Sequence, residues 1–197
     1  MDAYLASKKL RDASHFYLNF NFELLNGCKF NCRGCHVEKN AQQPISGEDA
    51  ARLLRLLGSF EGSLYRPFIA FVGPTDFLVA ENFEQVFSDP CNIPVFRRFR
   101  RLSFQTTYLD IRNAERVSRV LREHYADSEL EVNIVLDPAR IMDDQLLALV
   151  ERNKDAFLRM VGRNDVRIFG IMNVYDYDQT RIPELLRDYD FMHQRVK

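Results

Sequence analysis

Strand-like and helix-like segments alternate along this chain of 197 residues, and this alternation limits its fold more than any other feature. Segments with the two-residue apolar period of a strand, or with a short buried apolar run, are followed by stretches of helical period. Strands that alternate with helices pair in parallel, so the pattern predicts an α/β fold. The expected strands are 15–25, 67–72, 101–109, 129–136 and 165–174, and the expected helices are 46–57, 83–99 (broken by prolines), 113–125, 143–161 and 183–196.

Two architectures fit this pattern: an open doubly wound sheet, and a curved partial barrel of β/α units. The spacing of the segments is the same in both, so it does not separate them. The chain contains no repeat, low-complexity tract or linker, and its length is close to that of one domain. We therefore expect a single domain over residues 1–197, with a short N-terminal lead over residues 1–14.

Composition excludes several classes of protein. The chain has 27 Lys and Arg against 28 Asp and Glu, a net charge of −1, which argues against a dedicated nucleic-acid binder. It has no apolar run of the ~18–20 residues that span a bilayer. The opening MDAYLASKKLRD turns polar too early for a secretory signal. We expect a cytoplasmic protein without a membrane partner.

Three of the four cysteines lie close together, directly after the first expected strand, as Cys28-x3-Cys32-x2-Cys35. In a reducing compartment such a cluster indicates a metal or redox centre rather than disulfides. A structural zinc site requires a fourth ligand, which His36 or the distant Cys91 would have to supply. The spacing lacks the paired C-x2-C of zinc ribbons, and this favours an iron–sulfur cluster with one iron open to another ligand.

The motif Cys28-x3-Cys32-x2-Cys35 after a first strand, followed by repeating β/α units, resembles the radical S-adenosylmethionine (radical SAM) superfamily. The resemblance implies that the three cysteines bind a [4Fe-4S] cluster whose open iron holds S-adenosyl-L-methionine (SAM). It also implies reductive cleavage of SAM to a 5′-deoxyadenosyl radical, which abstracts hydrogen from a substrate. The implied fold is the partial (β/α) barrel, here with about five to six units.

The resemblance also implies contacts to SAM. The family carries a Gly-rich segment after the second strand, which binds the methionine end, although this chain has a single glycine and an Asp in place of GGE. The family's aromatic residue before the third cysteine is replaced by Gly34, so His36 or Phe30 would fill the space beside the adenine. The implied SAM-binding residues are Gly73, Pro74, Thr75, Asp76, Asn133, Asp137, Ile171 and His36.

Polar residues follow the remaining strands. Sites in parallel α/β folds form beyond the carboxyl ends of the strands, so we expect a substrate pocket there. Asp and Thr are also common in turns and helix caps, which is the alternative at each position. The expected pocket residues are Thr106, Asp110, Tyr175 and Asp176.

These features predict a radical SAM enzyme with an unidentified substrate and no assigned catalytic side chain. A small-molecule substrate is slightly favoured. The first alternative is an activase that generates a glycyl radical on a partner protein, and the second is a non-enzymatic zinc or iron–sulfur domain with a redox-sensing role. The expected partners are an electron donor such as flavodoxin or ferredoxin and, if the barrel is short, a chain that covers its open side.

Overall fold

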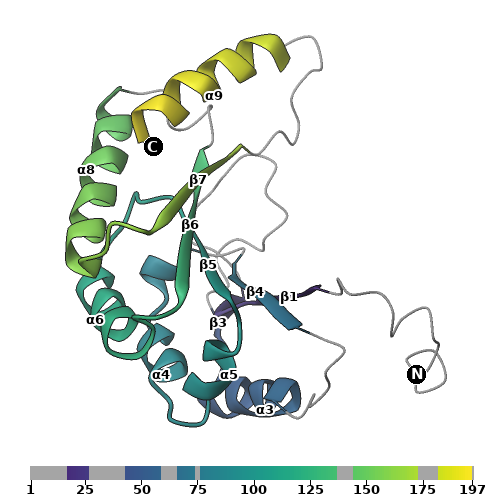
Figure 1. Cartoon of the computed structure of the whole chain (residues 1–197). Coiled ribbons are helices and arrows are strands. Elements are labelled where there is room, and N and C mark those ends of the chain that lie inside the picture. Colours follow the sequence, from purple (N-terminus) through teal and green to yellow (C-terminus); the bar gives the residue numbers. More distant parts are fainter. Residues whose placement is uncertain are drawn as a thin grey trace, which may run out of the picture.

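The computed structural model describes residues 17–26, 43–58, 66–73, 76–136, 144–172 and 182–196. Strands and helices alternate along these residues, which confirms the predicted α/β class (Figure 1). The elements are β1 (Tyr17–Phe22), β2 (Leu25–Asn26), β3 (Gln43–Pro44), α3 (Gly47–Gly58), β4 (Arg66–Val72), the 3-10 helix η1 (Phe77–Val79), α4 (Phe83–Phe87), α5 (Ile93–Arg97), β5 (Arg101–Thr106), α6 (Ala114–His124), β6 (Glu129–Leu136), α8 (Asp144–Val161), β7 (Arg167–Met172) and α9 (Ile182–Val196).

Five strands form one sheet in the order β1-β4-β5-β6-β7, and each neighbouring pair is parallel. This order follows the sequence without reversal, whereas a doubly wound sheet reverses its strand order at a switch point. β1 and β7 are the two edges, so the sheet is not closed. The described chain is therefore singly wound, which is consistent with a partial (β/α) barrel and not with the doubly wound alternative.

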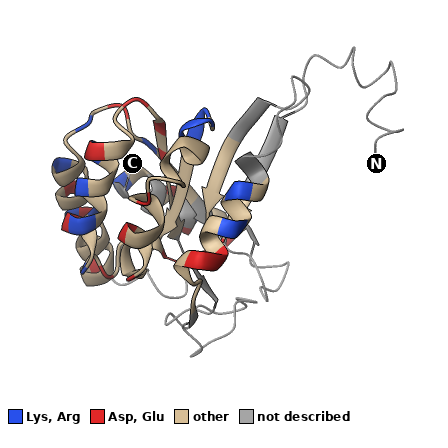
Figure 2. Cartoon of the chain, turned by 90° about the horizontal axis from the view of Figure 1, so that it is seen from below, with Lys and Arg blue, Asp and Glu red and all other residues tan. Residues whose placement is uncertain are grey.

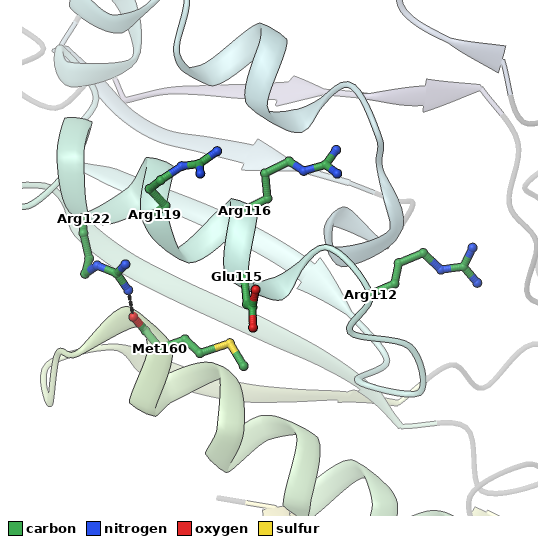
Figure 3. Close-up of a pocket in the computed structure, with 6 residues that line it drawn as sticks. All are labelled: Arg112, Glu115, Arg116, Arg119, Arg122 and Met160. Carbon is green, nitrogen blue, oxygen red and sulfur yellow. Dashed lines mark hydrogen bonds between the residues drawn. The ribbon is translucent and has the colours of Figure 1, made fainter.

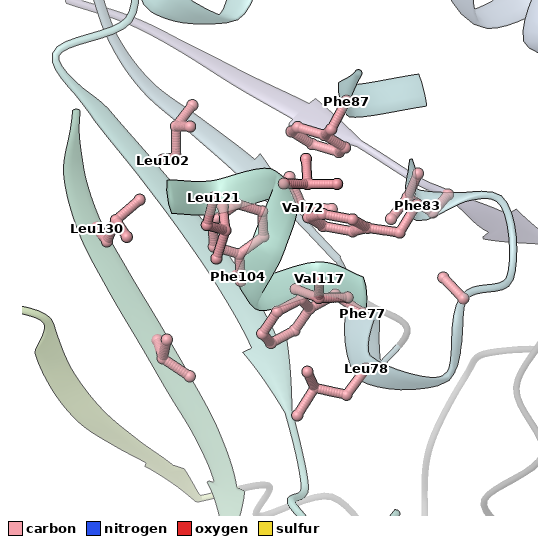
Figure 4. Close-up of a cluster of buried hydrophobic side chains, with 14 of the residues drawn as sticks. Val72, Phe77, Leu78, Phe83, Phe87, Leu102, Phe104, Val117, Leu121 and Leu130 are labelled. Carbon is pink, nitrogen blue, oxygen red and sulfur yellow. The ribbon is translucent and has the colours of Figure 1, made fainter. Parts of the chain in front are cut away.

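Helices cover one face of the sheet. Figure 1 shows α3, α4, α5, α6 and α8 on the same side of the strands. Alternate residues of each strand point into this layer, and the cluster in Figure 4 joins Leu102 and Phe104 of β5 to Val117 and Leu121 of α6. The ring of Phe104 stacks on that of Phe77 at 4.9 Å between centroids. Each fully buried side chain of this size stabilises the fold by about 1.5–3 kcal/mol, so this layer holds the sheet in place.

The opposite face of β5 and β6 is polar. The strand register pairs Arg101 with Glu129, Ser103 with Glu131, and Gln105 with Asn133. These six residues, here called the polar face, alternate with the core residues because side chains of a strand point in turn to its two sides. In these two strands, one side is apolar and lies under the helices, and the other side is polar.

Charge is mixed over the outside of the molecule. Figure 2 shows positions of Lys and Arg interspersed with those of Asp and Glu over the helices. Within the described ranges, no helix combines the length and apolar character needed to cross a bilayer.

Candidate functional site

The carboxyl ends of the five parallel strands lie at one edge of the sheet, and the loops that follow them form the candidate site. The main-chain N–H of Gly73, just after β4, donates to the carbonyl oxygen of Phe22, the last residue of β1, at 3.2 Å. The first two strand ends are therefore joined directly. The predicted SAM-binding loop begins at this point.

Asp76 organises the loop after β4. Its side chain is only 3% exposed, and its Oδ1 accepts a hydrogen bond from the main-chain N–H of Leu78 at 3.0 Å, which caps η1. Its Oδ2 accepts from the N–H of Thr107 at 2.8 Å and from the Thr107 hydroxyl at 2.9 Å. Burial raises the pKa of the Asp76 carboxyl, and the hydrogen bonds from Thr107 oppose that rise. The carboxylate links the ends of β4 and β5, and its expected contact with SAM stays a prediction.

Gly73 leaves room for an aromatic ring. A Cβ atom at this position would lie 2.6 Å from Cε1 and 2.7 Å from Cζ of Phe71, so any larger residue would displace that ring. Phe71 pairs in register with Ser103, next to the polar face. The glycine therefore allows the Phe71 ring to lie at the end of the strand, beside the polar face.

Asn133 lies on the polar face and is 7% exposed. It points away from Val132 and Ile134, which belong to the core. Its Nδ2 donates to the Ser103 hydroxyl at 2.6 Å, and that hydroxyl donates to Glu131 Oε1 at 2.9 Å. Glu131 in turn forms an ion pair with Arg101 at 2.9 Å. The carboxamide of Asn133 is thus held by a network that crosses β5 and β6.

Thr106 and Asp110 form local contacts in the turn that follows β5. Thr106 is fully buried, on the same side of β5 as Leu102 and Phe104, and its hydroxyl accepts from the N–H of Tyr108 at 3.0 Å. It therefore points under the helical layer, and its expected contact with a substrate stays a prediction. Asp110 accepts from the N–H of Arg112 at 3.0 Å and forms an ion pair with the same side chain at 2.6 Å. This is the turn role weighed as its alternative.

Tyr108 is a strained residue at the end of β5. Its φ angle is +54°, a value that is uncommon for any residue with a side chain. Asn153 of α8 donates to its carbonyl oxygen at 2.7 Å and holds this conformation. The hydroxyl is buried without a hydrogen-bond partner among the described residues. Burial, and then the charge of Asp76, raises its pKa well above the ordinary tyrosine value.

The remaining predicted site residues lie outside the described residues, and nothing is assigned to their structure. For Ile171 only the backbone is described, in β7 opposite Val135. In the part of the chain that is described, no group of three or more His, Cys, Asp or Glu side chains could hold a metal ion. The predicted site residues that lie outside the described ranges are Cys28, Cys32, Cys35, His36, Pro74, Thr75, Asp137, Tyr175 and Asp176.

The two ends of the cysteine-bearing segment 27–42 are nevertheless described. Asn26 and Gln43 face one another in the antiparallel β2–β3 pair, and the N–H of Ile45 donates to the carbonyl oxygen of Leu24 at 3.0 Å. The three cysteines therefore belong to a segment whose ends meet just after the end of β1. This is the edge of the sheet at which the Asp76 loop begins.

A groove of about 470 Å³ lies elsewhere, on the helical side (Figure 3). Four arginines line it with Glu115 and Met160, and each arginine has a partner in the chain. Arg112 pairs with Asp110, Arg116 and Arg119 pair with Glu84, and Arg122 donates to the carbonyl oxygen of Met160. Since these partners occupy the arginines, and the groove lies on the outer side of α6, we do not assign the site to it.

Sequence reasoning missed the polar partners of Asn133, although a signal for them was present. Glu129, Glu131 and Asn133 occupy every second position of a strand whose other residues are apolar, and this period marks one polar side. It also missed Asn82, which reads as an ordinary helix cap before α4. The chain gives no match to any protein-family model, and no curated protein is similar to it at a significant level.

Proposed function

We propose that this chain is a radical SAM enzyme. The single observation that carries the proposal is the motif Cys28-x3-Cys32-x2-Cys35 directly after the first strand of a singly wound, open parallel sheet. Three cysteines can bind a four-iron cluster and leave one iron for another ligand. The open sheet supports the proposal because the described helices pack on the apolar side of β5 and β6, and the polar face carries hydrogen-bonding side chains for a cofactor and a substrate.

The residues have separate roles in this proposal. Cys28, Cys32 and Cys35 act as thiolates toward the cluster. When bound, the [4Fe-4S] cluster and SAM supply reductive cleavage of SAM to methionine and a 5′-deoxyadenosyl radical. The loop of Gly73, Pro74, Thr75 and Asp76 binds the methionine end. Asp76 acts in it by fixing the loop to Thr107, because its carboxylate already accepts three internal hydrogen bonds.

The polar face orients the rest of SAM. Asn133 or Asp137 contacts the ribose, and His36 and the region of Ile171 lie near the adenine in this proposal. The carboxamide of Asn133 is suited to this role because Ser103 and Glu131 already fix its orientation, so binding orders no further side chain. The side chains of Tyr175 and Asp176 are proposed to meet the substrate.

The substrate class rests on charge. The balance of 27 basic and 28 acidic residues argues against a nucleic-acid substrate, so we favour a small molecule. Generation of a glycyl radical on a partner protein is the other use of the same radical. The electron is proposed to come from a small donor protein such as flavodoxin or ferredoxin.

The test is anaerobic reconstitution with iron and sulfide, followed by reduction in the presence of SAM. We expect iron and sulfide in the ratio of a four-iron cluster, visible absorption that bleaches on reduction, and release of 5′-deoxyadenosine. Cys32→Ala should abolish that release. Cys91→Ala is the matched control, because Cys91 is free and exposed, and it should leave the rate unchanged.

Two results would overturn the proposal. The first is release of 5′-deoxyadenosine by Cys32→Ala at the wild-type rate. The second is one zinc per chain with no bound sulfide, which would establish the non-enzymatic zinc domain instead.

A further inference from the structure

The side chain of Asn82 crosses to the two ends of the cysteine-bearing segment. Its Nδ2 donates to the carbonyl oxygen of Leu24 at 3.0 Å and to that of Ile45 at 3.1 Å. Both neighbours are acceptors, so the NH2 group of the carboxamide must face them. Leu24 precedes the segment 27–42 and Ile45 follows it, and one side chain therefore holds both ends.

Asn82 is itself held in the packed part of the molecule. It is 7% exposed and precedes α4, whose Phe83 and Phe87 are fully buried and stacked at 4.5 Å. It occupies the N-cap position of α4, but its side chain makes no cap hydrogen bond. The carboxamide of Asn82 therefore bonds to the distant carbonyl oxygens of Leu24 and Ile45 and does not cap α4.

Two groups of hydrogen bonds, joined by the short stretch of chain that contains η1, link three strand ends. Thr107, after β5, donates to Asp76, after β4, and Asp76 caps η1 through the N–H of Leu78. Asn82 lies just beyond η1 and donates to Leu24, after β1. The base of the cysteine segment is thus fixed to the same loop that is proposed to bind the methionine end of SAM.

We infer that Asn82 is a positioning residue for the iron–sulfur cluster, an inference that rests on the proposed function. It acts through the main chain, by setting the separation of the two ends of the segment that carries Cys28, Cys32 and Cys35. Without it, the described bonds that remain between the ends are the two-residue β2–β3 pair and the bond from Ile45 to Leu24. Residues that hydrogen-bond directly to metal ligands typically change metal affinity 10–100-fold, and Asn82 acts one step further out, so a smaller change is expected.

Asn92 provides a matched control. It is 1% exposed, occupies the N-cap of α5 without a cap hydrogen bond, and has a buried Oδ1 without a partner among the described residues, as Asn82 does. Its Nδ2, however, donates to the nearby carbonyl oxygen of Val86 at 3.0 Å. Asn92→Ala therefore removes the same buried carboxamide without touching the cysteine segment.

The experiment compares Asn82→Ala and Asn92→Ala with the wild-type chain. In the apo protein, we expect Asn82→Ala alone to speed hydrogen exchange at the Ile45 amide, and to change the alkylation rates of Cys28, Cys32 and Cys35 relative to the exposed Cys91. After reconstitution, it should lose iron to a chelator several-fold faster than the wild-type chain and Asn92→Ala, within roughly the 10-fold lower bound for direct partners of metal ligands. It should also change the electron paramagnetic resonance spectrum of the reduced cluster with SAM. Equal values for both variants in these measurements would overturn the inference.

Two further outcomes remain decisive. If Asn82→Ala does not fold, hydrogen exchange in the wild-type chain supplies the test. The side-chain amide protons of Asn82 should exchange with solvent as slowly as the main-chain amides of α4. Exchange at the rate of a free amide would overturn the inference. If the wild-type chain binds no cluster, the proposed function fails, while the Ile45 and cysteine measurements on the apo protein still show whether Asn82 fixes the segment.

Discussion

Replacement of Asp76 by alanine tests the link between the ends of β4 and β5. The change removes three hydrogen bonds and leaves the N–H groups of Leu78 and Thr107 without an acceptor. Leu78 is fully buried and Thr107 is 7% exposed, so water cannot replace the carboxylate freely. Each unpaired buried donor costs about 1–3 kcal/mol, and the free energy of unfolding should fall by about 3–5 kcal/mol. That is a large share of the ~5–15 kcal/mol of a typical domain.

Asp89→Ala is the control for this prediction. Asp89 accepts from the N–H of Cys91 at 2.7 Å, the same two-residue spacing as in the Asp76 turn, but Cys91 is exposed. Water can replace this acceptor, so the loss should be about 0.5–1 kcal/mol. The difference in the free energy of unfolding between the two variants measures the contribution of the buried bonds from Asp76 to Thr107, beyond that of an exposed turn bond.

Urea unfolding followed by far-ultraviolet circular dichroism measures both variants, since the chain has no tryptophan for fluorescence. If Asp76→Ala does not fold, Thr107→Val removes the hydroxyl bond to Asp76, together with the longer bond that the same hydroxyl accepts from the N–H of Leu109 at 3.3 Å. It should cost about 1.5–3 kcal/mol, the value of a bond to a charged group. A loss for Asp76→Ala within about 1 kcal/mol of that for Asp89→Ala would refute the reasoning.

Three further predictions concern single groups. Burial raises the pKa of Asp76 above 3.8, so the folded chain binds the carboxyl proton of Asp76 more tightly than the unfolded chain does. The free energy of unfolding of the wild type, relative to that of Asp76→Asn, should therefore fall as the pH rises through the folded-state pKa. Denaturant titrations at several pH values measure this difference, and an increase with pH would contradict the prediction. Tyr125→Phe should cost about 1 kcal/mol in thermal unfolding, because the hydroxyl donates to a carbonyl oxygen at 2.8 Å, whereas Tyr108→Phe should leave Tm unchanged or higher; equal losses would refute this contrast. Glu131→Ala should cost about 2 kcal/mol in urea unfolding, less than a fully broken buried pair because Arg101 also contacts Glu129, and no loss would argue against the network.

The alternation of residues predicted the faces of the sheet but not its winding. The period of two in residues 129–136 placed Val132 in the core and Asn133 opposite, as found. The interrupted helix over 83–99 became two short helices, 83–87 and 93–97, and Pro94 lies in the first turn of the second. Strand order depends on contacts between units distant in sequence, so the same spacing fits a doubly wound sheet equally well.

Site residues were harder to predict, because their partners are distant in sequence. Asp76 reads as a strand-end carboxylate, and its partner Thr107 is 31 residues away. Asn82 reads as a helix cap, and its acceptors are 58 and 37 residues away. Thr106 is different: Leu102 and Phe104 at alternate positions already indicate that it points under the helices.

The strand order β1-β4-β5-β6-β7 makes this protein resemble a short repeat array in its energetics. Each strand pairs only with its predecessor and successor, so stability is close to a sum of nearest-neighbour terms, and the two ends of the array can open separately. The last unit pairs with β6 and contacts α8, and its opening breaks no pairing among β1, β4 and β5. The side of the sheet that carries the cysteine segment can therefore stay closed while the far side moves. In such an arrangement the separation of β6 and β7 and the pairing of β1 with β4 are under separate thermodynamic control.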